Sequence, residues 1–187
     1  TSGGAGKKLY PNTVILSTST GFNRPYDRPG TAYPDYDLLD SRPFYQINAL
    51  DERLPTKQRV HGVLLGQAPD AYKTKVYQIK TNQGPRLIND IFANQDILVI
   101  DAGRENFVVS YSRVVDNIAL FFEIENKDAT FPFTFKDKET NSTWNVLGEA
   151  INGPLAGTKL ERPLSFNAYW FAWAAFYSNT EIYDPSS

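Results

Sequence analysis

From Arg59 onward, short apolar segments alternate with turn residues, and this pattern restricts the chain to a β fold. The segments are rich in Val, Ile, Tyr and Phe, which favour strands over helices. Between them, Ala102–Arg104 and Val115–Asn117 have the composition of hairpin turns. Strands at this spacing predict an antiparallel barrel or a twisted sandwich. The predicted strands are Val60–Leu65, Ala71–Ile79, Arg86–Ile91, Asp96–Ile100, Phe107–Arg113, Ile118–Glu125 and Phe131–Lys136.

Two short helices are expected beside these strands. One lies near Trp144–Ala150, and the other is Asn167–Tyr177, where Trp170, Trp173 and Tyr177 fall on one helical face. The predicted fold class is therefore mainly β: an antiparallel barrel or twisted sandwich with a short C-terminal helix and an irregular N-terminal arm.

The first part of the chain has a different composition. Thr1–Lys8 is small and glycine-rich, which indicates a flexible leader, and Thr13–Ser17 is a predicted short strand. Thr18–Asp40 contains several prolines, which cannot donate to a strand ladder. The arm's aromatic side chains either fill the protein's own barrel or stack on a sugar or protein ligand; they are Tyr26, Tyr33, Tyr36, Phe44 and Tyr45. We expect residues 1–58 to be leader and arm, and residues 59–187 to be the β-rich core of one folding unit.

The two ends of the chain resemble each other. Leu9–Ile15 and Phe176–Ile182 each run through an aromatic residue, a small residue and Asn-Thr into a predicted strand. The similarity is either a coincidence of turn chemistry or the same helix-end-to-strand element used twice. In the second interpretation Val14, Ile15 and Leu16 form an assembly strand that pairs with a neighbouring subunit's sheet and builds a filament. The alternative is that the arm folds back on its own domain.

Composition excludes several classes of function. The net charge of −2 gives no electrostatic basis for binding nucleic acid or an anionic membrane. The chain has no cysteine and one histidine, His61, so thiol chemistry and histidine-rich metal centres are excluded, and we expect no metal or cofactor. No apolar run is long enough to span a membrane. Because the chain begins without methionine, we expect an exported protein that is extracellular, periplasmic or part of the cell envelope.

The stretch from Phe133 to Leu160 carries the most specific pattern. It reads Asp-x-Glu-Thr, then Ser-x-Trp, then a Gly-Pro-Leu-Ala-Gly corner, and Trp-Phe-x-Trp follows further along the chain. These residues are Asp137, Glu139, Thr140, Ser142, Trp144, Gly153, Pro154, Leu155, Ala156, Gly157, Trp170 and Trp173. Together with Leu50–Pro55, Asn89-Asp90 and Pro11–Thr13, they resemble domain of unknown function family 3179 of bacteria and archaea, over almost the whole chain. The resemblance implies an exported or envelope-associated domain with no assigned activity.

This chain departs from the family pattern in three places. Asn141 replaces a glycine after Thr140, and asparagine tolerates the left-handed backbone that such a turn needs. Ser178 stands where proline is usual. The cysteine-containing segment that many members carry after Asn-Asp is missing, so no thiol role transfers to this protein.

Several polar groups are candidates for a site. Asp137 and Glu139, with Asp128, could bind a cation, but carboxylates at this spacing more often accept hydrogen bonds from turn amides. Asn89, Asp90 and Arg113 could form a polar pocket or a buried ion pair that stabilises the fold. The remaining members of the polar signature are Thr140, Ser142 and Trp144, and Asn141 begins a glycosylation sequon.

No catalytic motif stands out, so we expect a non-enzymatic domain that binds or assembles. The alternative is a carboxylate-dependent hydrolase or carbohydrate-active enzyme that uses Asp90, Asp137 or Glu139. That alternative requires two carboxyl groups facing each other across a cleft.

Overall fold

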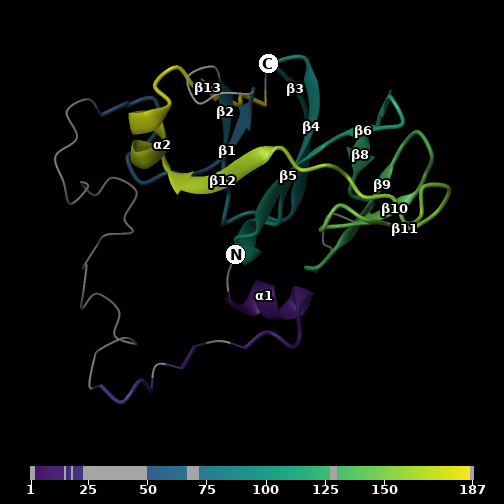
Figure 1. Cartoon of the computed structure of the whole chain (residues 1–187), viewed down its shortest axis with the longest axis horizontal. Coiled ribbons are helices and arrows are strands. Elements are labelled where there is room, and N and C mark those ends of the chain that lie inside the picture. The colour runs from purple at the N-terminus through teal and green to yellow at the C-terminus, as the bar shows by residue number, and fades with distance from the viewer. Residues whose placement is uncertain are drawn as a thin grey trace.

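The computed structural model describes residues 3–14, 16–17, 19–22, 50–66, 72–126 and 130–185. These residues form a mainly β protein with several antiparallel sheets and a short C-terminal helix, which confirms the predicted fold class (Figure 1). The described part of the chain contains separate sheets and no closed barrel, so the barrel is the wrong one of the two predicted alternatives. None of its helices has the length and apolar character needed to span a membrane.

The first layer is a four-stranded sheet in the order β12-β1-β2-β13. Its strands are β12 (Leu164–Tyr169), β1 (Arg59–Leu65), β2 (Lys73–Gln78) and β13 (Glu181–Ile182). The neighbours are antiparallel except β13, which pairs in parallel with β2. Alternate residues of β1 face opposite sides: Val60 and Leu64 pack against helix α2 (Trp170–Phe176), whereas Val63 and Leu65 face the second sheet.

The second sheet lies in the middle of the molecule and is buried on both faces. It consists of β3 (Arg86–Phe92), β4 (Gln95–Asp101) and β5 (Val108–Ser112), in that order. Ile97 and Val99 of β4 pack towards the first sheet, and Leu98 and Ile100 pack into the larger core on the other side. The continuous apolar run in β4 is therefore explained by two covered faces rather than one.

The third sheet, in the order β11-β10-β9-β8, covers that larger core. Its strands are β8 (Phe122–Glu123), β9 (Thr134–Asp137), β10 (Thr143–Asn145) and β11 (Ala150–Asn152). A small hairpin of β6 (Val114–Val115) and β7 (Ile118–Ala119) connects the second and third sheets, and the 3-10 turn η2 (Gly103–Glu105) follows β4. The predicted strand Ile118–Glu125 is thus two short strands, β7 and β8.

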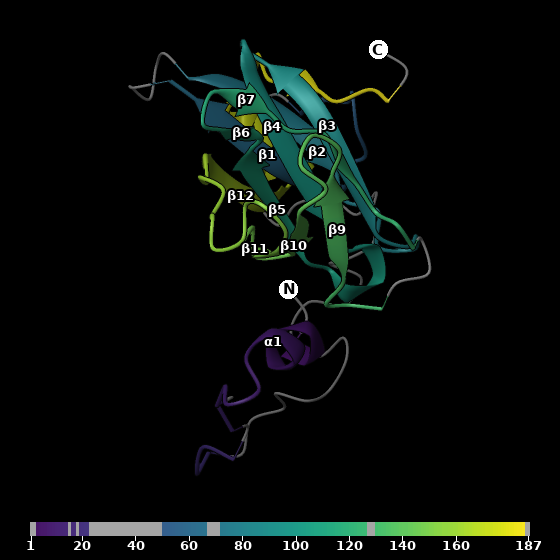
Figure 2. The ribbon, with the colours of Figure 1, turned by 90° about the vertical axis from the view of Figure 1, so that its right-hand side faces the viewer.

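The N-terminal leader contains helix α1 (Gly3–Leu9), whereas its glycine-rich composition predicted no regular structure. Ala5 is fully buried and Leu9 packs against the larger core, so contact with the body holds a helix whose glycines disfavour it. After α1 the chain leads away from the sheets, as Figures 1 and 2 both show. The predicted strand Thr13–Ser17 is wrong for the described residues Thr13, Val14, Leu16 and Ser17, which belong to no strand.

Two other expectations about secondary structure were wrong. Trp144–Ala150 is not a helix but the hairpin between β10 and β11, because the Asn145 side chain accepts hydrogen bonds from the backbone of Leu147 and Glu149 and closes a turn. The C-terminal helix begins at Trp170 rather than Asn167, because Asn167–Tyr169 pairs with β1. Ile15, Asp128 and the arm aromatics Tyr26, Tyr33, Tyr36, Phe44 and Tyr45 lie outside the described residues.

Candidate functional site

The signature turn, Asp137–Trp144, is organised around one buried carboxylate. The Asp137 side chain accepts hydrogen bonds from the Trp144 indole N–H at 2.8 Å and from the Thr140 hydroxyl at 2.8 Å, and from the Thr140 backbone N–H. Thr140 in turn lies 2.7 Å from the Ser142 hydroxyl, which accepts from the backbone N–H of Leu155. The turn and the Gly153–Gly157 corner are therefore joined by side chains. Asn141 takes the left-handed backbone, with a φ of 58°, that the sequence required of it.

Two further signature residues hold the start of β8. The Glu139 carboxylate accepts a hydrogen bond from the backbone N–H of Phe121 at 2.8 Å. The Asn89 side chain both donates to the Phe122 carbonyl and accepts from its N–H, each at 2.9 Å. The Asn89 side chain therefore links β3 directly to the backbone of β8. The ring of Phe122 packs edge-on against Trp144, with 5.6 Å between centroids.

Asp90 faces the other side of β3 and belongs to a different cluster. Its carboxylate lies 2.7 Å from the Lys75 ammonium group and accepts a hydrogen bond from the Tyr77 hydroxyl at 2.8 Å. Burial, reinforced by the negative charge of Asp90, raises the pKa of Tyr77, so this phenol stays protonated. Asn89 and Asp90 thus connect β3 to the third and the first sheet respectively.

The sequence placed Arg113 beside Asn89-Asp90, and the structure gives it a different carboxylate partner. The Arg113 guanidinium pairs with Asp96 at 2.7 Å and donates to the carbonyl of Leu120, and it reaches Asp90 only at its backbone carbonyl. The ion pair of Arg113 is therefore formed with the half-buried Asp96 and not with Asp90.

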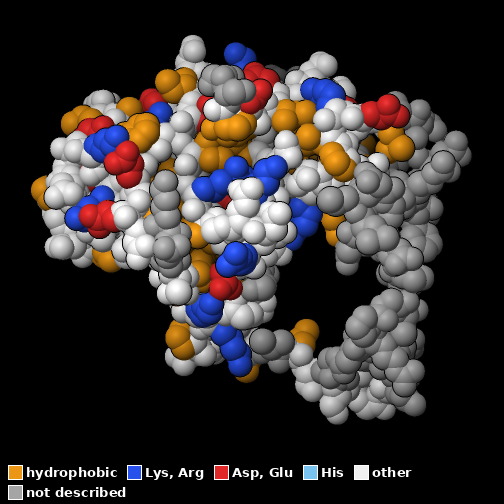
Figure 3. All heavy atoms as spheres, turned by 180° about the vertical axis from the view of Figure 1, so that it is seen from behind, with side chains coloured by type: hydrophobic (Ala, Val, Ile, Leu, Met, Phe, Trp, Pro, Cys, Tyr) orange, Lys and Arg blue, Asp and Glu red, His pale blue; other side chains and the backbone are white. Residues whose placement is uncertain are grey.

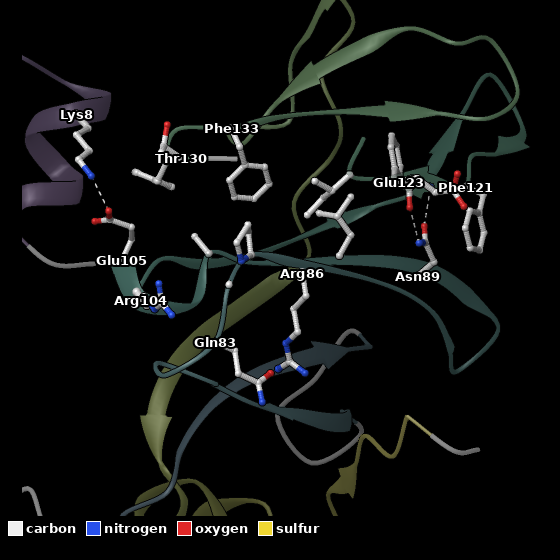
Figure 4. A pocket seen from close by; sticks show the side chains of 17 residues that line it. Lys8, Gln83, Arg86, Asn89, Arg104, Glu105, Phe121, Glu123, Thr130 and Phe133 are labelled. Atoms are coloured by element: carbon white, nitrogen blue, oxygen red, sulfur yellow. Dashed lines mark hydrogen bonds and ion pairs between the residues drawn. The ribbon is translucent and has the colours of Figure 1, made fainter. Parts of the chain in front are cut away.

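A cavity of about 1130 Å³ lies between β3 and the third sheet. Figure 4 shows it running from Lys8 and Glu105 at one end to Asn89 and Phe121 at the other. We call it the β3–β8 cavity, because β3 and β8 flank it and each is the last described strand of its sheet. Its apolar lining comes from both sides: Leu87, Phe121, Phe122, Ile124, Phe131 and Phe133.

The charges around this cavity are largely paired at its rim. Lys8 of α1 lies 2.5 Å from Glu105, and Glu123 pairs with Lys138 at 2.7 Å. On the face turned away from the viewer in Figure 1, lysine and arginine side chains gather across the middle with hydrophobic side chains on either side (Figure 3). The cavity therefore has a mixed lining, in which apolar side chains of β3 and the third sheet lie beside charged and polar groups.

A second constellation resembles a catalytic arrangement but is closed to substrate. His61 lies 2.7 Å from the side-chain oxygen of Asn167 and 3.1 Å from the Ser110 hydroxyl, in the order of a nucleophile, a base and an orienting group. Ser110 is fully buried and lines no part of the β3–β8 cavity. Burial lowers the pKa of His61 to about 4, although the Asn167 hydrogen bond opposes this, so the imidazole is neutral at pH 7. The three residues tie β12 and β1 to the second sheet.

The structure brings together most of the residues that the sequence singled out. Asp137, Thr140, Ser142 and Trp144 form the signature turn, Glu139 and Asn89 bind the backbone of Phe121 and Phe122, and Asp90 lies on the other face of β3. Of these residues, only Asn89 lines the cavity. Sequence reasoning missed the lining itself, since Lys8, Glu105 and Phe133 are far apart in the chain and carry no common motif. The described residues contain no group of three His, Asp or Glu side chains able to hold a metal ion. Asn141 is exposed, and its glycosylation stays a prediction.

The two chain ends repeat the same local structure. Helices α1 and α2 each have seven residues and end at Leu9 and Phe176, the positions that the sequence similarity aligns. In each case the residue after the helix donates its N–H four residues back, Tyr10 to Gly6 and Tyr177 to Trp173. The threonine three residues later closes the turn by donating its N–H to the carbonyl of that tyrosine: Thr13 to Tyr10 at 3.0 Å and Thr180 to Tyr177 at 3.1 Å. The C-terminal copy then continues as β13, while Val14 and Leu16 of the N-terminal copy are 95% and 96% exposed.

Comparison with protein families shows the family of the chain. The model of the family described as "Protein of unknown function (DUF3179)" matches residues 1–180, so the chain belongs to this family. Neither the curated proteins nor the solved structures contain a match to it.

Proposed function

We propose that this DUF3179 protein is a non-enzymatic assembly module whose N-terminal strand segment, residues 13–17, adds to a sheet of another subunit. The observation that carries the proposal is the repeated helix–turn element, which is followed by a paired strand at one end of the chain and by an unpaired segment at the other. The proposal includes an extracellular or cell-envelope location.

The exposed apolar side chains of the segment support this function. Val14 and Leu16 point away from the body of their own chain and are almost completely exposed. Burying two such side chains against a partner would contribute about 1.5–3 kcal/mol each. In strand addition the main-chain hydrogen bonds supply affinity, and pockets for alternate side chains supply specificity.

The hydrolase alternative finds little support in the same geometry. Asp137 is surrounded by donors from its own turn, and Asp90 is paired with Lys75 and Tyr77. Glu139 accepts a backbone hydrogen bond from Phe121. Such hydrogen bonds are typical of carboxylates that stabilise a fold. The carboxylates among the residues that line the β3–β8 cavity are Glu105 and Glu123, and both are ion-paired.

The proposal is tested by measuring the size of the full-length protein against concentration, by light scattering and electron microscopy. We expect the wild-type protein to form polymers and the double variant Val14→Asp/Leu16→Asp to remain a monomer. Because both side chains are exposed, the double variant should keep its free energy of unfolding within about 0.5 kcal/mol of the wild type for each substitution.

A conservative double variant, Val14→Ile/Leu16→Ile, is the matched control and should still polymerise. Deleting residues 13–17, which leaves α1 and its contacts with the larger core in place, should likewise give a folded monomer. A wild-type protein that stays monomeric at the highest attainable concentration would refute the proposal.

A further inference from the structure

We infer that the β3–β8 cavity is the acceptor for the N-terminal strand segment of a second copy of this chain. The inference rests on the proposed function and identifies the partner surface. It requires that Val14 and Leu16 of one subunit enter the cavity of the next and that the segment's backbone pairs with β3.

The donor segment has the composition of a strand that is buried on both faces. Residues 9–22 contain no charged side chain, and residues 13–17 read Thr-Val-Ile-Leu-Ser. Such a sequence favours a strand with apolar side chains on both faces. An edge strand that is exposed to water normally carries a charge or a proline as protection, and this segment has neither.

The acceptor has the shape that strand addition needs. β3 pairs with β4 on one side, and no described strand pairs with its other side. β8 likewise has only β9 as a described neighbour. Between them lies a cavity of about 1130 Å³, larger than the usual volume for a small ligand, with Lys8 and Glu105 at one end and Asn89 and Phe121 at the other (Figure 4). Five residues of strand extend about 17 Å, whereas the seven residues of β3 extend about 23 Å, so the donor is short enough for this edge.

The lining of the cavity is about as polar as it is apolar, and its apolar part matches the donor. Leu87 of β3 and Phe133, which precedes β9, contribute apolar surface to the lining, where alternate donor side chains would be buried. The acidic groups Glu105 and Glu123 are paired with Lys8 and Lys138, and Arg86 is paired with Asp101, so an uncharged occupant leaves these groups paired. Arg104, which also lines the cavity, has no ion-pair partner among the described residues and would have to stay at the water-exposed border.

Other edges of the described sheets, including those of β5, β11, β12 and β13, compete for the segment. The position beside β2 is already filled by the protein's own β13. The outer edge of β12 has no described strand beside it, and its Leu164 and Phe166 are 55% and 43% exposed. However, neither residue lines the cavity, so a strand added there would bury at most one face of its side chains.

The geometry directs the exchange between subunits. α1 lies at one end of the cavity through Lys8, and the chain then leaves the body instead of entering the cavity (Figure 2). Donor and acceptor are different surfaces of one chain, so their contact is head-to-tail and extends into a filament unless the rotation closes a ring.

Engineered disulfides test the acceptor directly, because the chain has no cysteine of its own. The double variant Leu16→Cys/Leu87→Cys places one thiol on the donor and one in the cavity. Leu16→Cys/Leu164→Cys is the matched control, with the second thiol on the edge of β12. Both are assembled, oxidised and separated on a denaturing gel without reductant. We expect a ladder of covalent multimers from the first variant and none beyond dimers from the control, because a disulfide requires Cα atoms within about 7 Å.

The outcomes separate this inference from the proposed function. Polymers that cross-link into a ladder only through Leu164→Cys would overturn the cavity as acceptor while leaving assembly intact. A disulfide within one chain would overturn the exchange, because it means that the segment enters its own cavity. If Leu87→Cys weakens the fold, Thr130→Cys on the exposed opposite wall replaces it. Failure of the wild type to polymerise refutes the proposed function itself.

Discussion

At each end of this chain a seven-residue helix is followed by the same turn, but the segments after the two turns differ in their contacts. α2 is followed by β13, which pairs with β2, and its Ile182 joins the core beneath the helix. α1 is followed by Val14 and Leu16, which contact almost nothing. Since the hydrogen bonds of the two turns are the same, the turn does not decide whether the next segment is held. The difference must lie in the helices.

Alignment of the helices at Leu9 and Phe176 shows what differs. Gly3 and Gly6 of α1 stand where α2 has Trp170 and Trp173. Trp173 lies directly on Gly62 of β1, where even a Cβ atom would meet its ring at 2.0 Å, and its indole N–H donates to Thr180 in the turn. The tryptophans therefore fix the C-terminal turn and strand to the first sheet. The N-terminal turn lacks them, and the described residues of the segment that follows it belong to no sheet.

The largest expected effect comes from removing this anchor. Trp173→Ala should lower the free energy of unfolding by about 3–5 kcal/mol, the usual cost of deleting a large buried aromatic side chain. It also leaves the Thr180 hydroxyl without its donor. Urea titration of the variant, with secondary structure followed by circular dichroism, measures the loss.

If Trp173 holds β13 on the first sheet, its removal should also weaken the pairing of β13 with β2. Hydrogen exchange of the Tyr183 N–H, which donates to Val76, should accelerate in Trp173→Ala more than exchange in β4. Trp173→Phe keeps most of the ring and serves as the control. A Trp173→Ala protein with wild-type stability would mean that α2 does not hold β13.

A second difference between the ends depends on pH. β12, which leads into α2, is tied to the second sheet through the buried His61, whereas the titratable contact of α1 is the exposed ion pair between Lys8 and Glu105. The pKa of His61 is about 4 in the folded protein against 6.5 when it is exposed. Between these values the unfolded chain binds more protons than the folded one, so stability is full above pH 6.5 and falls as the pH drops towards 4. The loss at pH 4.5 relative to pH 8 should be about 2–3 kcal/mol.

The histidine contribution is isolated with His61→Gln, which cannot titrate in this range. Unfolding free energies of both proteins at pH 8 and pH 4.5 are compared, because carboxylates elsewhere affect the two equally. The wild type should lose more stability than the variant. Equal losses would show that His61 is not held neutral by burial.

How much of this could be predicted from the sequence depends on how local the cause is. The strands β1 to β5 follow from alternating apolar residues and turn chemistry within each segment. The hairpin at Trp144–Ala150 was missed because its apolar spacing is also helical, and the Asn145 side chain, not the spacing, decides the turn. The start of α2 was misplaced because pairing with β1 overrides helical periodicity at Asn167.

The two parts of the candidate site, the signature turn and the cavity, also differ in how far the sequence predicts them. The signature turn could be identified from Asp137, Thr140 and Trp144, because these residues are close in sequence and bond to one another. The β3–β8 cavity could not, because its walls come from α1, η2, β3 and the third sheet and meet only through the packing of the layers. The chain-end similarity predicted the common turn, but not which end would keep its strand. That depends on Gly6 and Trp173 and on what lies beneath each helix.

The smallest effect is expected at the N-terminal counterpart of the anchor. Gly6 has no heavy atom within 4 Å of where a Cβ would lie, and its φ is not in the left-handed region, so alanine fits without strain. Gly6→Ala should stabilise α1 by about 0.5–1 kcal/mol, because alanine loses less backbone entropy than glycine in a helix. The gain should appear as slower hydrogen exchange in α1 and as a small rise in melting temperature, with assembly unchanged. A loss of stability at Gly6, comparable to that of Trp173→Ala, would show that α1 is packed as tightly as α2, and the N-terminal segment would then need another explanation for its exposure.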